Sequence, residues 1–281
     1  MTTALVTGSS TGIGYATALR LAREGAQVIA TMRDPHASDL DEVAAREGLS
    51  IELAPLDVTS DAGVATVFED VTRRYGPLDV LVANAGVGGS GGAVETTSLD
   101  VFRETMETNF FGALRCVKAV VPGMRSRGRG TIIATSSQAG RIAFPMMSAY
   151  VASKWALEGA MESLAASLSP FGVRVVIIEP GTILTPIFGK GDLGDSPDYA
   201  DLATATVGMM MHDITHGSDP EVVADCIANA ITSDAPHLRY LVGQGAERNV
   251  RVREELGDDG FVSLWAQPAE TIVASLLAGE M

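Results

Sequence analysis

The chain has 281 residues, a length that suits one α/β domain with a full hydrophobic core. Its formal charge of −15, from 20 basic and 35 acidic residues, argues against nucleic acid or an anionic membrane as a partner. No apolar run reaches the roughly 18 residues that a membrane-spanning helix needs, so a soluble protein is expected.

Cysteine usage and the start of the chain both indicate the cytoplasm. Cys116 and Cys226 are the two cysteines, and their wide separation in sequence is typical of reduced, buried thiols. The first predicted strand begins at residue 3, which leaves no room for a cleavable signal sequence. We therefore expect a cytoplasmic protein.

A short apolar strand at residues 3–7 runs directly into a glycine-rich turn and then a helical pattern. At such a junction, free backbone N–H groups and the helix dipole favour a pyrophosphate. Gly8 permits the tight turn, Gly12 lets the backbone approach a ligand, and Gly14 allows close packing of helix and strand. The spacing is G-x3-G-x-G, which differs from the commoner G-x-G-x-x-G fingerprint.

Strand and helix patterns alternate along the rest of the chain. Strands are predicted at residues 27–31, 51–55, 79–83, 131–135, 173–178 and 239–242. Helices are predicted at residues 38–46, 61–75, 99–108, 110–126, 150–169 and 219–233. Alternation of this kind predicts an α/β fold: one doubly wound, Rossmann-type domain over residues 1–281. Its sheet would have about seven parallel strands, helices on both faces and a ligand crevice at the strand carboxyl ends.

Three side chains that suit proton transfer lie near the strand at 131–135. Ser137 follows that strand, and Tyr150 and Lys154 are spaced to share one helix face. A cation about 4 Å from a phenol is worth up to roughly 4 kcal/mol at an effective dielectric near 20, enough to lower a pKa of about 10 by some two units. Lys154 would then make Tyr150 a usable acid or base, and Ser137 could donate to the reacting oxygen. A bare Y-x3-K pattern, however, is most often an exposed pair on an amphipathic helix.

The sequence TGxxxGIG near the start, combined with S-x12-Y-x3-K in the middle, resembles the short-chain dehydrogenase/reductase family. The resemblance covers about residues 3–243. Other matching motifs are Asp57 after a strand, Asn84-Ala85-Gly86 after the next strand, Asn109 in a helix, and Pro180-Gly181. The chain has Ala83-Asn84 where the family usually has two asparagines, a departure that leaves Asn84 in place.

The resemblance implies roles for four catalytic residues. Tyr150 would be the acid/base, and Ser137 would orient the substrate oxygen. Lys154 would lower the pKa of Tyr150 and bind the nicotinamide ribose, while Asn109 would hold a water that relays protons to Lys154. From the residues alone, Asn109 could instead cap a local kink in its helix.

The resemblance also implies a nicotinamide dinucleotide cofactor. Gly8, Ile13 and Gly14 would cradle the pyrophosphate, Asp57 and Val58 would meet the adenine, Asn84 and Ala85 would lie along the ribose, and Pro180, Gly181, Ile183 and Thr185 would fix the nicotinamide. The other residues expected to contact the cofactor are Ser10, Thr11, Gly12, Arg33, Gly86, Tyr150 and Lys154. Thr185 would bind the carboxamide.

The choice between NADP(H) and NAD(H) depends on the end of the second strand. An NAD enzyme usually carries an acid there, but this chain has Met32 followed by Arg33. A cation suits a 2′-phosphate. Asp34 is close enough to weaken the preference, and Thr11 offers only a neutral hydroxyl. NADP(H) is favoured, with NAD(H) as the alternative.

The substrate side is predicted to be apolar. Residues 138–149 connect Ser137 to Tyr150 and contain Arg141 as their single charge. The expected substrate contacts are Ile142, Phe144, Met147, Leu184 and Phe188. Burying a charged substrate there would be costly, so we expect neutral ketones or alcohols; for a charged substrate, Arg141 would be the anion partner.

Three further segments carry weaker signals. In the resembling family, the position of residues 186–217 holds a mobile substrate lid. Residues 86–92 include five glycines, which suits either a surface turn or a segment that moves beside the cofactor. His212 and His216 are one helical turn apart but lack a third ligand at a suitable spacing, so no metal site is predicted.

Residues 156–159 and 169–173, with residues 30–34, resemble the 17β-hydroxysteroid and retinol dehydrogenase branch. This implies an NADP(H)-dependent oxidoreductase that interconverts a secondary alcohol and a ketone, with a bulky, apolar, steroid- or retinoid-like substrate. The alternatives are a 3-oxoacyl thioester reductase, which the acidic surface disfavours, and a catalytically idle NADP-binding sensor or scaffold. A homodimer or homotetramer is expected from the family, through helices within 99–126 and 150–169.

Overall fold

The computed structural model describes residues 2–89, 91–189 and 197–277, without the side chains of residues 188 and 189. Its centre is a seven-stranded sheet in the order β3-β2-β1-β4-β5-β6-β7, in which all neighbours are parallel. The strands are β1 (Thr3–Thr7), β2 (Gln27–Met32), β3 (Ile51–Pro55), β4 (Val80–Ala83), β5 (Gly130–Thr135), β6 (Val173–Pro180) and β7 (Arg239–Val242). The predicted doubly wound α/β fold is therefore confirmed.

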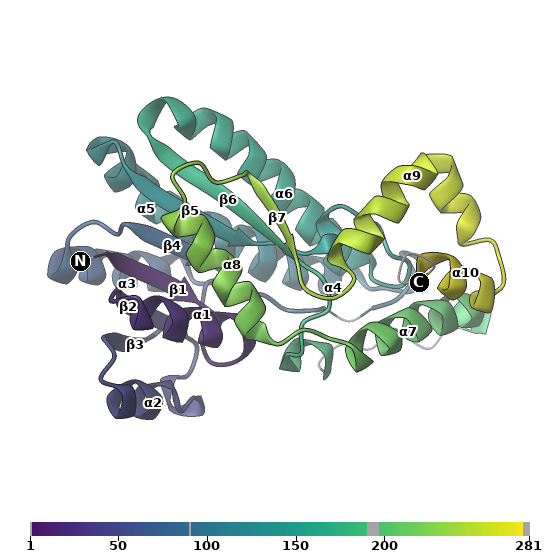
Figure 1. Ribbon diagram of the computed structural model, residues 1–281, viewed down its shortest axis with the longest axis horizontal. Helices are drawn as coiled ribbons and strands as arrows, with labels where there is room; N and C mark the ends of the chain where they lie inside the picture. The colour runs from purple at the N-terminus through teal and green to yellow at the C-terminus, as the bar shows by residue number, and fades with distance from the viewer. Residues whose placement is uncertain (1, 90, 190–196, 278–281) are drawn as a thin grey trace.

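Ten α-helices surround this sheet in the described part of the chain (Figure 1). They are α1 (Gly12–Arg23), α2 (Leu40–Glu47), α3 (Asp61–Tyr75), α4 (Leu99–Met106), α5 (Ala113–Arg127), α6 (Ser148–Leu168), α7 (Ala200–Thr215), α8 (Pro220–Thr232), α9 (Ala246–Leu264) and α10 (Ala269–Leu277). The short helical turns are η1 (Pro35–Ala37), η2 (Glu107–Gly112), η3 (Gln138–Gly140), η4 (Ser169–Phe171), η5 (Pro186–Gly189) and η6 (Pro197–Tyr199). None of the described helices has the length and apolar character that crossing a membrane requires.

The two faces of the sheet carry separate hydrophobic cores. Side chains along a strand alternate between faces, so within β1 Leu5 points to one core while Ala4 and Val6 point to the other. Helices α3, α5 and α6 cover the first face, and α1, α2 and α8 cover the second. Because both faces are covered, the strands read as continuous apolar runs in the sequence.

A third apolar cluster lies beyond the sheet. It joins α7, α9 and α10 with residues of the segment that connects η3 to α6. Figure 1 shows these three helices gathered at one end of the molecule, opposite the N-terminus. The residues past 243, which lie outside the sequence resemblance, thus form α9 and α10 over the carboxyl ends of the strands, with a non-helical break at Gly257 in α9.

Two predicted helix boundaries differ from the structure. The expected break between helices 99–108 and 110–126 is absent, because the π-helical η2 joins α4 to α5 without interruption. Gly112 is what lets this wide turn pack, since a Cβ there would lie 2.6 Å from Val58 Cγ2. The helix expected at 38–46 begins at Leu40, after Pro35 starts the separate turn η1.

Candidate active site

Ser137, Tyr150 and Lys154 converge at the carboxyl end of β5. Ser137 caps η3, and its Oγ accepts a hydrogen bond from Ala139 N at 3.1 Å. Helix α6 carries Tyr150 in its first turn and Lys154 one turn later. The lysine Nζ lies 5.6 Å from the centroid of the Tyr150 ring and donates to Thr135 O at 2.9 Å. The three side chains that were predicted from spacing therefore share one site.

The electrostatics of this trio differ from the expectation based on charge alone. Burial raises the pKa of Tyr150, and a hydrogen bond with Ser137 acts against that rise. Burial lowers the pKa of Lys154 to about 8, and the charge of Glu158 opposes the change. The ammonium is directed at the Thr135 carbonyl, and the hydrogen bond with Ser137 opposes the rise in the pKa of Tyr150.

Asn109 lies in the π-helical turn and links it to two other elements. Its Oδ1 accepts from Val87 N at 2.8 Å, and its Nδ2 donates to Val87 O at 2.9 Å and to Ser153 Oγ at 3.0 Å. The Ser153 hydroxyl in turn donates to Tyr150 O at 2.7 Å. The buried amide thus anchors the glycine-rich segment to α6, and its role in a proton relay stays a prediction.

The glycine turn between β1 and α1 forms a cradle of backbone. Gly8 and Gly12 have positive φ angles of 70° and 60°. A Cβ at Gly8 would lie 2.8 Å from Ala85 Cα, and one at Gly12 would lie 2.8 Å from Thr185 Cγ2. Thr11 makes no side-chain cap to α1, whose first turn holds no acidic residue, so its amide donors and dipole suit an anion.

The end of β4 is fastened to this turn. Asn84 N donates to Thr7 Oγ1 at 2.9 Å, and the Asn84 Nδ2 donates to Thr7 O at 3.0 Å. A Cβ at Gly14 would lie 2.6 Å from that Nδ2 and 2.3 Å from Gly8 O. The side chain of Asn84, which was predicted to lie along the ribose, is thus also the tie that fixes the glycine turn.

A sequence model of the family described as short chain dehydrogenase matches residues 2–193. The chain belongs to this family. It is 39% identical over 254 residues to bovine retinol dehydrogenase 8, covering 84% of this chain and 80% of that protein. It is 36% identical over 256 residues to human 17-beta-hydroxysteroid dehydrogenase type 1, covering 85% of this chain and 77% of that protein.

Solved structures of the family have the same fold. A short-chain dehydrogenase from Streptomyces avermitilis is 37% identical, with a TM-score of 0.80 over 93% of this chain and 97% of that one. An alcohol dehydrogenase from Thermococcus sibiricus, complexed with 5-hydroxy-NADP, is 26% identical, with a TM-score of 0.72 over 87% and 97%. An NAD+-bound xylitol dehydrogenase is 27% identical, with a TM-score of 0.73 over 86% and 98%. This short-chain dehydrogenase is thus an oxidoreductase of a fold that carries either nicotinamide cofactor.

The residues expected around the adenosine lie at the ends of β2 and β3. Arg33 is exposed directly after β2, and the Asp34 carboxylate caps η1 by accepting from His36 N at 2.9 Å. Asp57 Oδ1 accepts from Thr59 N at 2.9 Å, which lowers the pKa of Asp57, and Arg33 contributes to that lowering. Val58 is buried.

The nicotinamide side was expected at residues 180–185, directly after β6. Gly181 N donates to Val242 O at 2.9 Å, and a Cβ on Gly181 would lie 2.1 Å from Gln244 O. The Ile183 side chain is buried in the second core, so it packs inward. Thr185 is the member of this segment that meets the glycine turn, at Gly12.

The predicted substrate residues separate into three groups. Ile142 and Phe144 are buried in the third cluster, where Met147 and the Tyr150 ring pack at the edge. Leu184 is 44% exposed, and the Phe188 side chain lies outside the described residues. Beside this segment is a mostly apolar depression of about 440 Å³, lined by Ala93, Val94, Glu95, Pro145, Met146, Ser148, Tyr199 and Leu202.

The backbone of this segment is held in an uncommon conformation. Met146, a buried residue without β-branching, has a φ of 60°. Its carbonyl accepts from Gly92 N at 2.7 Å, and Ser148 Oγ donates to Gly92 O at 3.1 Å. The glycine-rich segment 86–92 is thereby attached to the start of the Tyr150 helix.

Some residues of the site have no counterpart among the sequence predictions. Arg141 does not stand alone in its loop: it pairs with Glu179 at 3.4 Å and with Glu254 at 3.0 Å. Neither Glu179 nor Glu254 belongs to a motif that the sequence predicted for the site. Glu158, one helical turn after Lys154, was also missed as a charged neighbour, although its spacing on the helix could have revealed it.

Proposed function

We propose that this short-chain dehydrogenase uses NADP(H) to interconvert a secondary alcohol and a ketone, with a bulky, apolar substrate. The observation that carries the proposal is the meeting of Ser137, Tyr150 and Lys154 at the strand ends, with the Tyr150 ring at the edge of an apolar cluster. A proton-transferring hydroxyl and an apolar wall are what such a substrate needs in one place.

Tyr150, Ser137 and Lys154 have different roles around the substrate oxygen. In ketone reduction, the Tyr150 hydroxyl gives its proton to the carbonyl oxygen, and in alcohol oxidation Tyr150 takes that proton back. Ser137 donates a hydrogen bond to the same oxygen, where charge develops. Lys154 places a positive charge next to Tyr150. A bound nicotinamide supplies or accepts the hydride.

Arg33 supports the choice of NADP(H). It follows β2 in the sequence, and the residue is exposed at the carboxyl end of that strand. A guanidinium can bind a 2′-phosphate through paired, charge-assisted hydrogen bonds. Asp34 is engaged by the backbone of η1 through His36 N, which limits its competition for that cation.

Both the relatives and the packing support an apolar substrate. The names of two relatives refer to retinol and to a hydroxysteroid, which are ring-bearing, largely apolar alcohols. In this chain, α7 and the third cluster face the segment that leads to Tyr150. We propose that residues 186–217, which include α7, form a substrate lid; residues 190–196 of this stretch lie outside the described residues. The alternatives of a thioester reductase or an idle scaffold have no specific observation in their favour.

We also propose that the protein is a homo-oligomer. Trp155 on α6 and Phe111 in η2 are 48% and 44% exposed, and both lie within the helices 99–126 and 150–169 that were expected to form an interface. Exposed aromatic rings are common anchors of protein interfaces. Sedimentation or light scattering of the parent and of Trp155→Glu measures the oligomeric state; an unchanged mass in the variant contradicts this interface.

The function can be tested by following the oxidation of NADPH and of NADH spectroscopically with a panel of ketones. The panel pairs ring-bearing apolar ketones with small polar ones of similar reactivity, and the parent is compared with Ser137→Ala. Turnover of the apolar ketones with NADPH, and its loss in the variant, is the expected result. Absence of turnover with every ketone and alcohol would support the scaffold instead.

A further inference from the structure

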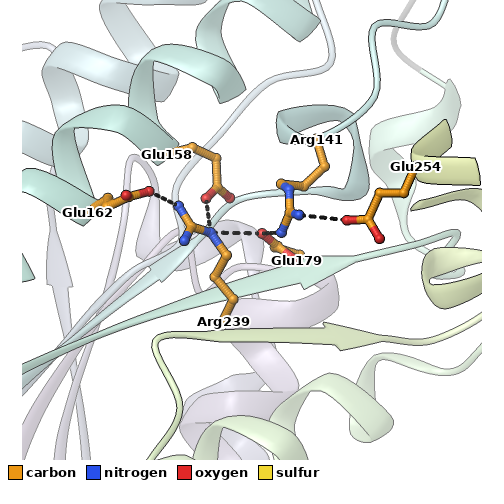
Figure 2. A network of polar contacts seen from close by, with 6 residues as sticks. All are labelled: Arg141, Glu158, Glu162, Glu179, Arg239 and Glu254. Atoms are coloured by element: carbon orange, nitrogen blue, oxygen red, sulfur yellow. Dashed lines mark hydrogen bonds and ion pairs between the residues drawn. The ribbon is translucent and has the colours of Figure 1, made fainter. Parts of the chain in front are cut away.

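A network of six charged side chains lies against the helix that carries Tyr150 and Lys154 (Figure 2). Its members come from α6, β6, β7, α9 and the residue after η3. They are Glu158 and Glu162, Glu179, Arg239, Glu254 and Arg141, respectively. In Figure 2, the two arginines alternate with the acids, and Glu179 contacts both arginines.

Two of the four acids in this network are buried. The side chains of Glu179 and Glu158 are 0% and 6% exposed, whereas those of Glu162 and Glu254 are 61% and 64% exposed. One nitrogen, Arg239 Nε, lies 3.0 Å from Glu158 Oε2 and 3.3 Å from Glu179 Oε1. Glu158 Oε1 and Glu179 Oε2 have no hydrogen-bond partner among the described residues. The buried acids therefore compete for a single N–H group.

Arg239 Nε lies closer to Glu158 than to Glu179. Burial, and then repulsion by Glu158, raises the pKa of Glu179 to about 7. Arg141 Nη1 reaches Glu179 at a long 3.4 Å, while its Nη2 is directed at Glu254. When Glu179 takes up a proton, the Arg239 Nε–H remains for Glu158.

Glu158 shares a helix face with Lys154 and packs against the turn that follows Ser137. It lies four residues after Lys154, so the two side chains share one face of α6, and both are buried. On the other side, a Cβ at Gly140 would lie 2.7 Å from Glu158 Cγ and 3.2 Å from its Oε1. The turn that begins at Ser137 therefore packs directly on this carboxylate.

We propose that Glu158 is a positioning residue of the active site, whose buried carboxylate keeps Lys154 in its charged form. Arg239 holds the carboxylate in place, through an Nε that lies 3.0 Å from Glu158 Oε2. Among the described residues, other titratable or charged groups near this pair are Tyr150, whose ring centroid lies 5.6 Å from Lys154 Nζ, and Arg141, which pairs with Glu179. The inference rests on the proposed function, because the charge of Lys154 matters only if it acts on Tyr150.

The sequence makes the charge of Lys154 directly measurable. The chain contains three lysines, Lys118, Lys154 and Lys190, so lysine labelled with ¹³C and ¹⁵N gives three sets of side-chain signals. The Lys154→Arg variant assigns one of them. A pH titration of the full-length protein then yields the midpoint of Lys154, which should lie near 8 in the parent.

Two matched glutamine variants distinguish the effect of the Glu158 carboxylate on Lys154 from the effect of removing any negative charge from α6. In Glu158→Gln, loss of a negative charge one helical turn away should lower the Lys154 midpoint by about one pH unit. Glu162→Gln removes an exposed carboxylate from the same helix, one that also pairs with Arg239. The Lys154 midpoint should then stay within about 0.2 units of the parent value, as expected for a screened charge. Equal midpoints in the parent and Glu158→Gln, or equal shifts in both variants, overturn the proposal.

Melting temperatures verify that each variant is folded. Should Glu158→Gln not fold, Glu158→Met fills the same space with an apolar group, a replacement that buried ionic sites often tolerate. Glu158→Met should lower the Lys154 midpoint by the same amount as Glu158→Gln, and a midpoint equal to that of the parent would again overturn the proposal. A structural role alone would lower the melting temperature but would leave the Lys154 midpoint unchanged.

The titration needs no substrate, so it distinguishes this inference from the proposed function. If Glu158→Gln shifts Lys154 while Tyr150→Phe retains full turnover, the coupling of Glu158 to Lys154 stands and the catalytic assignment fails. If Lys154 does not shift while Tyr150→Phe is inactive, the positioning role of Glu158 fails alone. With an active substrate, the pH profile of kcat/KM in Glu158→Gln should move to lower pH by about the same one unit.

Discussion

Burial and hydrogen bonding have opposite effects on the pKa of Tyr150. Burial stabilises its neutral phenol, and the Ser137 hydroxyl stabilises the charged form. A protonated phenol can donate to a ketone oxygen, as the proposed reduction requires. The oxidative direction then depends on positive charge nearby, which Lys154 provides from one helical turn away.

Replacing Tyr150 by Phe removes the proton donor but keeps the ring in the third cluster. We expect turnover to fall by roughly 10²- to 10⁴-fold, while cofactor affinity remains close to that of the parent. Steady-state kinetics and cofactor titration measure the two effects. Tyr75→Phe, which removes an exposed phenol hydrogen-bonded to Glu52, is the control and should retain full activity. Near-normal turnover of Tyr150→Phe contradicts the assignment.

Arg33 carries the prediction on cofactor choice. The parent should use NADPH more efficiently than NADH, and Arg33→Ala should remove most of that preference. Loss of a charge-assisted contact of about 1.5–3 kcal/mol corresponds to roughly a ten- to hundredfold change in the ratio of kcat/KM values. Arg46→Ala, an exposed arginine on the neighbouring α2, controls for general charge. A parent enzyme that prefers NADH would show that Arg33 does not decide the choice.

At the scale of elements, the sequence predicted the strands well because they are buried on both faces. Runs such as residues 131–135 and 173–178 are continuous and β-branched, and their pattern depends little on distant residues. The π-helical turn η2 could not be predicted in this way. It depends on Gly112 meeting Val58 from another part of the chain, which no local pattern encodes.

In the candidate site, too, local sequence patterns could be predicted and contacts between distant residues could not. The spacing of Tyr150 and Lys154, and that of the glycines in the turn, are local, so both motifs could be recognised from the sequence alone. The contact of Arg239 with Glu158 and Glu179 joins residues up to 81 positions apart and follows only from the sheet order. Helices α9 and α10 were not predicted, because the family resemblance ends before them.

The tie between η2, the glycine-rich segment and α6 can be tested at Asn109. Asn109→Ala removes the acceptor of Val87 N–H and both donors of the buried amide. The free energy of unfolding should fall by about 1–3 kcal/mol, and the Val87 amide should exchange faster with solvent. Asn229→Ala, on the exposed face of α8, should change neither. Unchanged exchange at Val87 in Asn109→Ala would contradict the anchoring role.

At the scale of the molecule, the C-terminal helices connect the proposed lid to the catalytic turn. Arg248 on α9 forms a buried ion pair with Asp213 on α7 at 2.8 Å. The neighbouring Asn249 Nδ2 donates to Gln138 Oε1 at 2.9 Å, next to Ser137. Helix α9 thus holds α7 and η3 together, which links the proposed lid to the turn that begins after Ser137.

Breaking that ion pair should destabilise the protein strongly. Arg248→Met leaves the Asp213 carboxylate buried without this cation, which typically costs about 3–5 kcal/mol in the free energy of unfolding. Denaturant unfolding measures the loss. Arg251→Met, at an exposed position of the same helix, should cost less than about 0.5 kcal/mol. A second change, Asp213→Asn, should restore part of the stability of Arg248→Met, and a purely additive effect would contradict a direct pair.

The shape of the substrate side leads to the last prediction. The third cluster and the apolar depression near Pro145 border the segment that leads to Tyr150, and the charge of Arg141 is engaged by two acids. A substrate that extends along this surface gains by burying apolar area in the transition state. For a series of neutral ketones, each added methylene should contribute up to about 0.8 kcal/mol, or about fourfold in kcat/KM, until the available surface is filled. A flat series, or the highest kcat/KM for a charged ketone, would contradict an apolar substrate site.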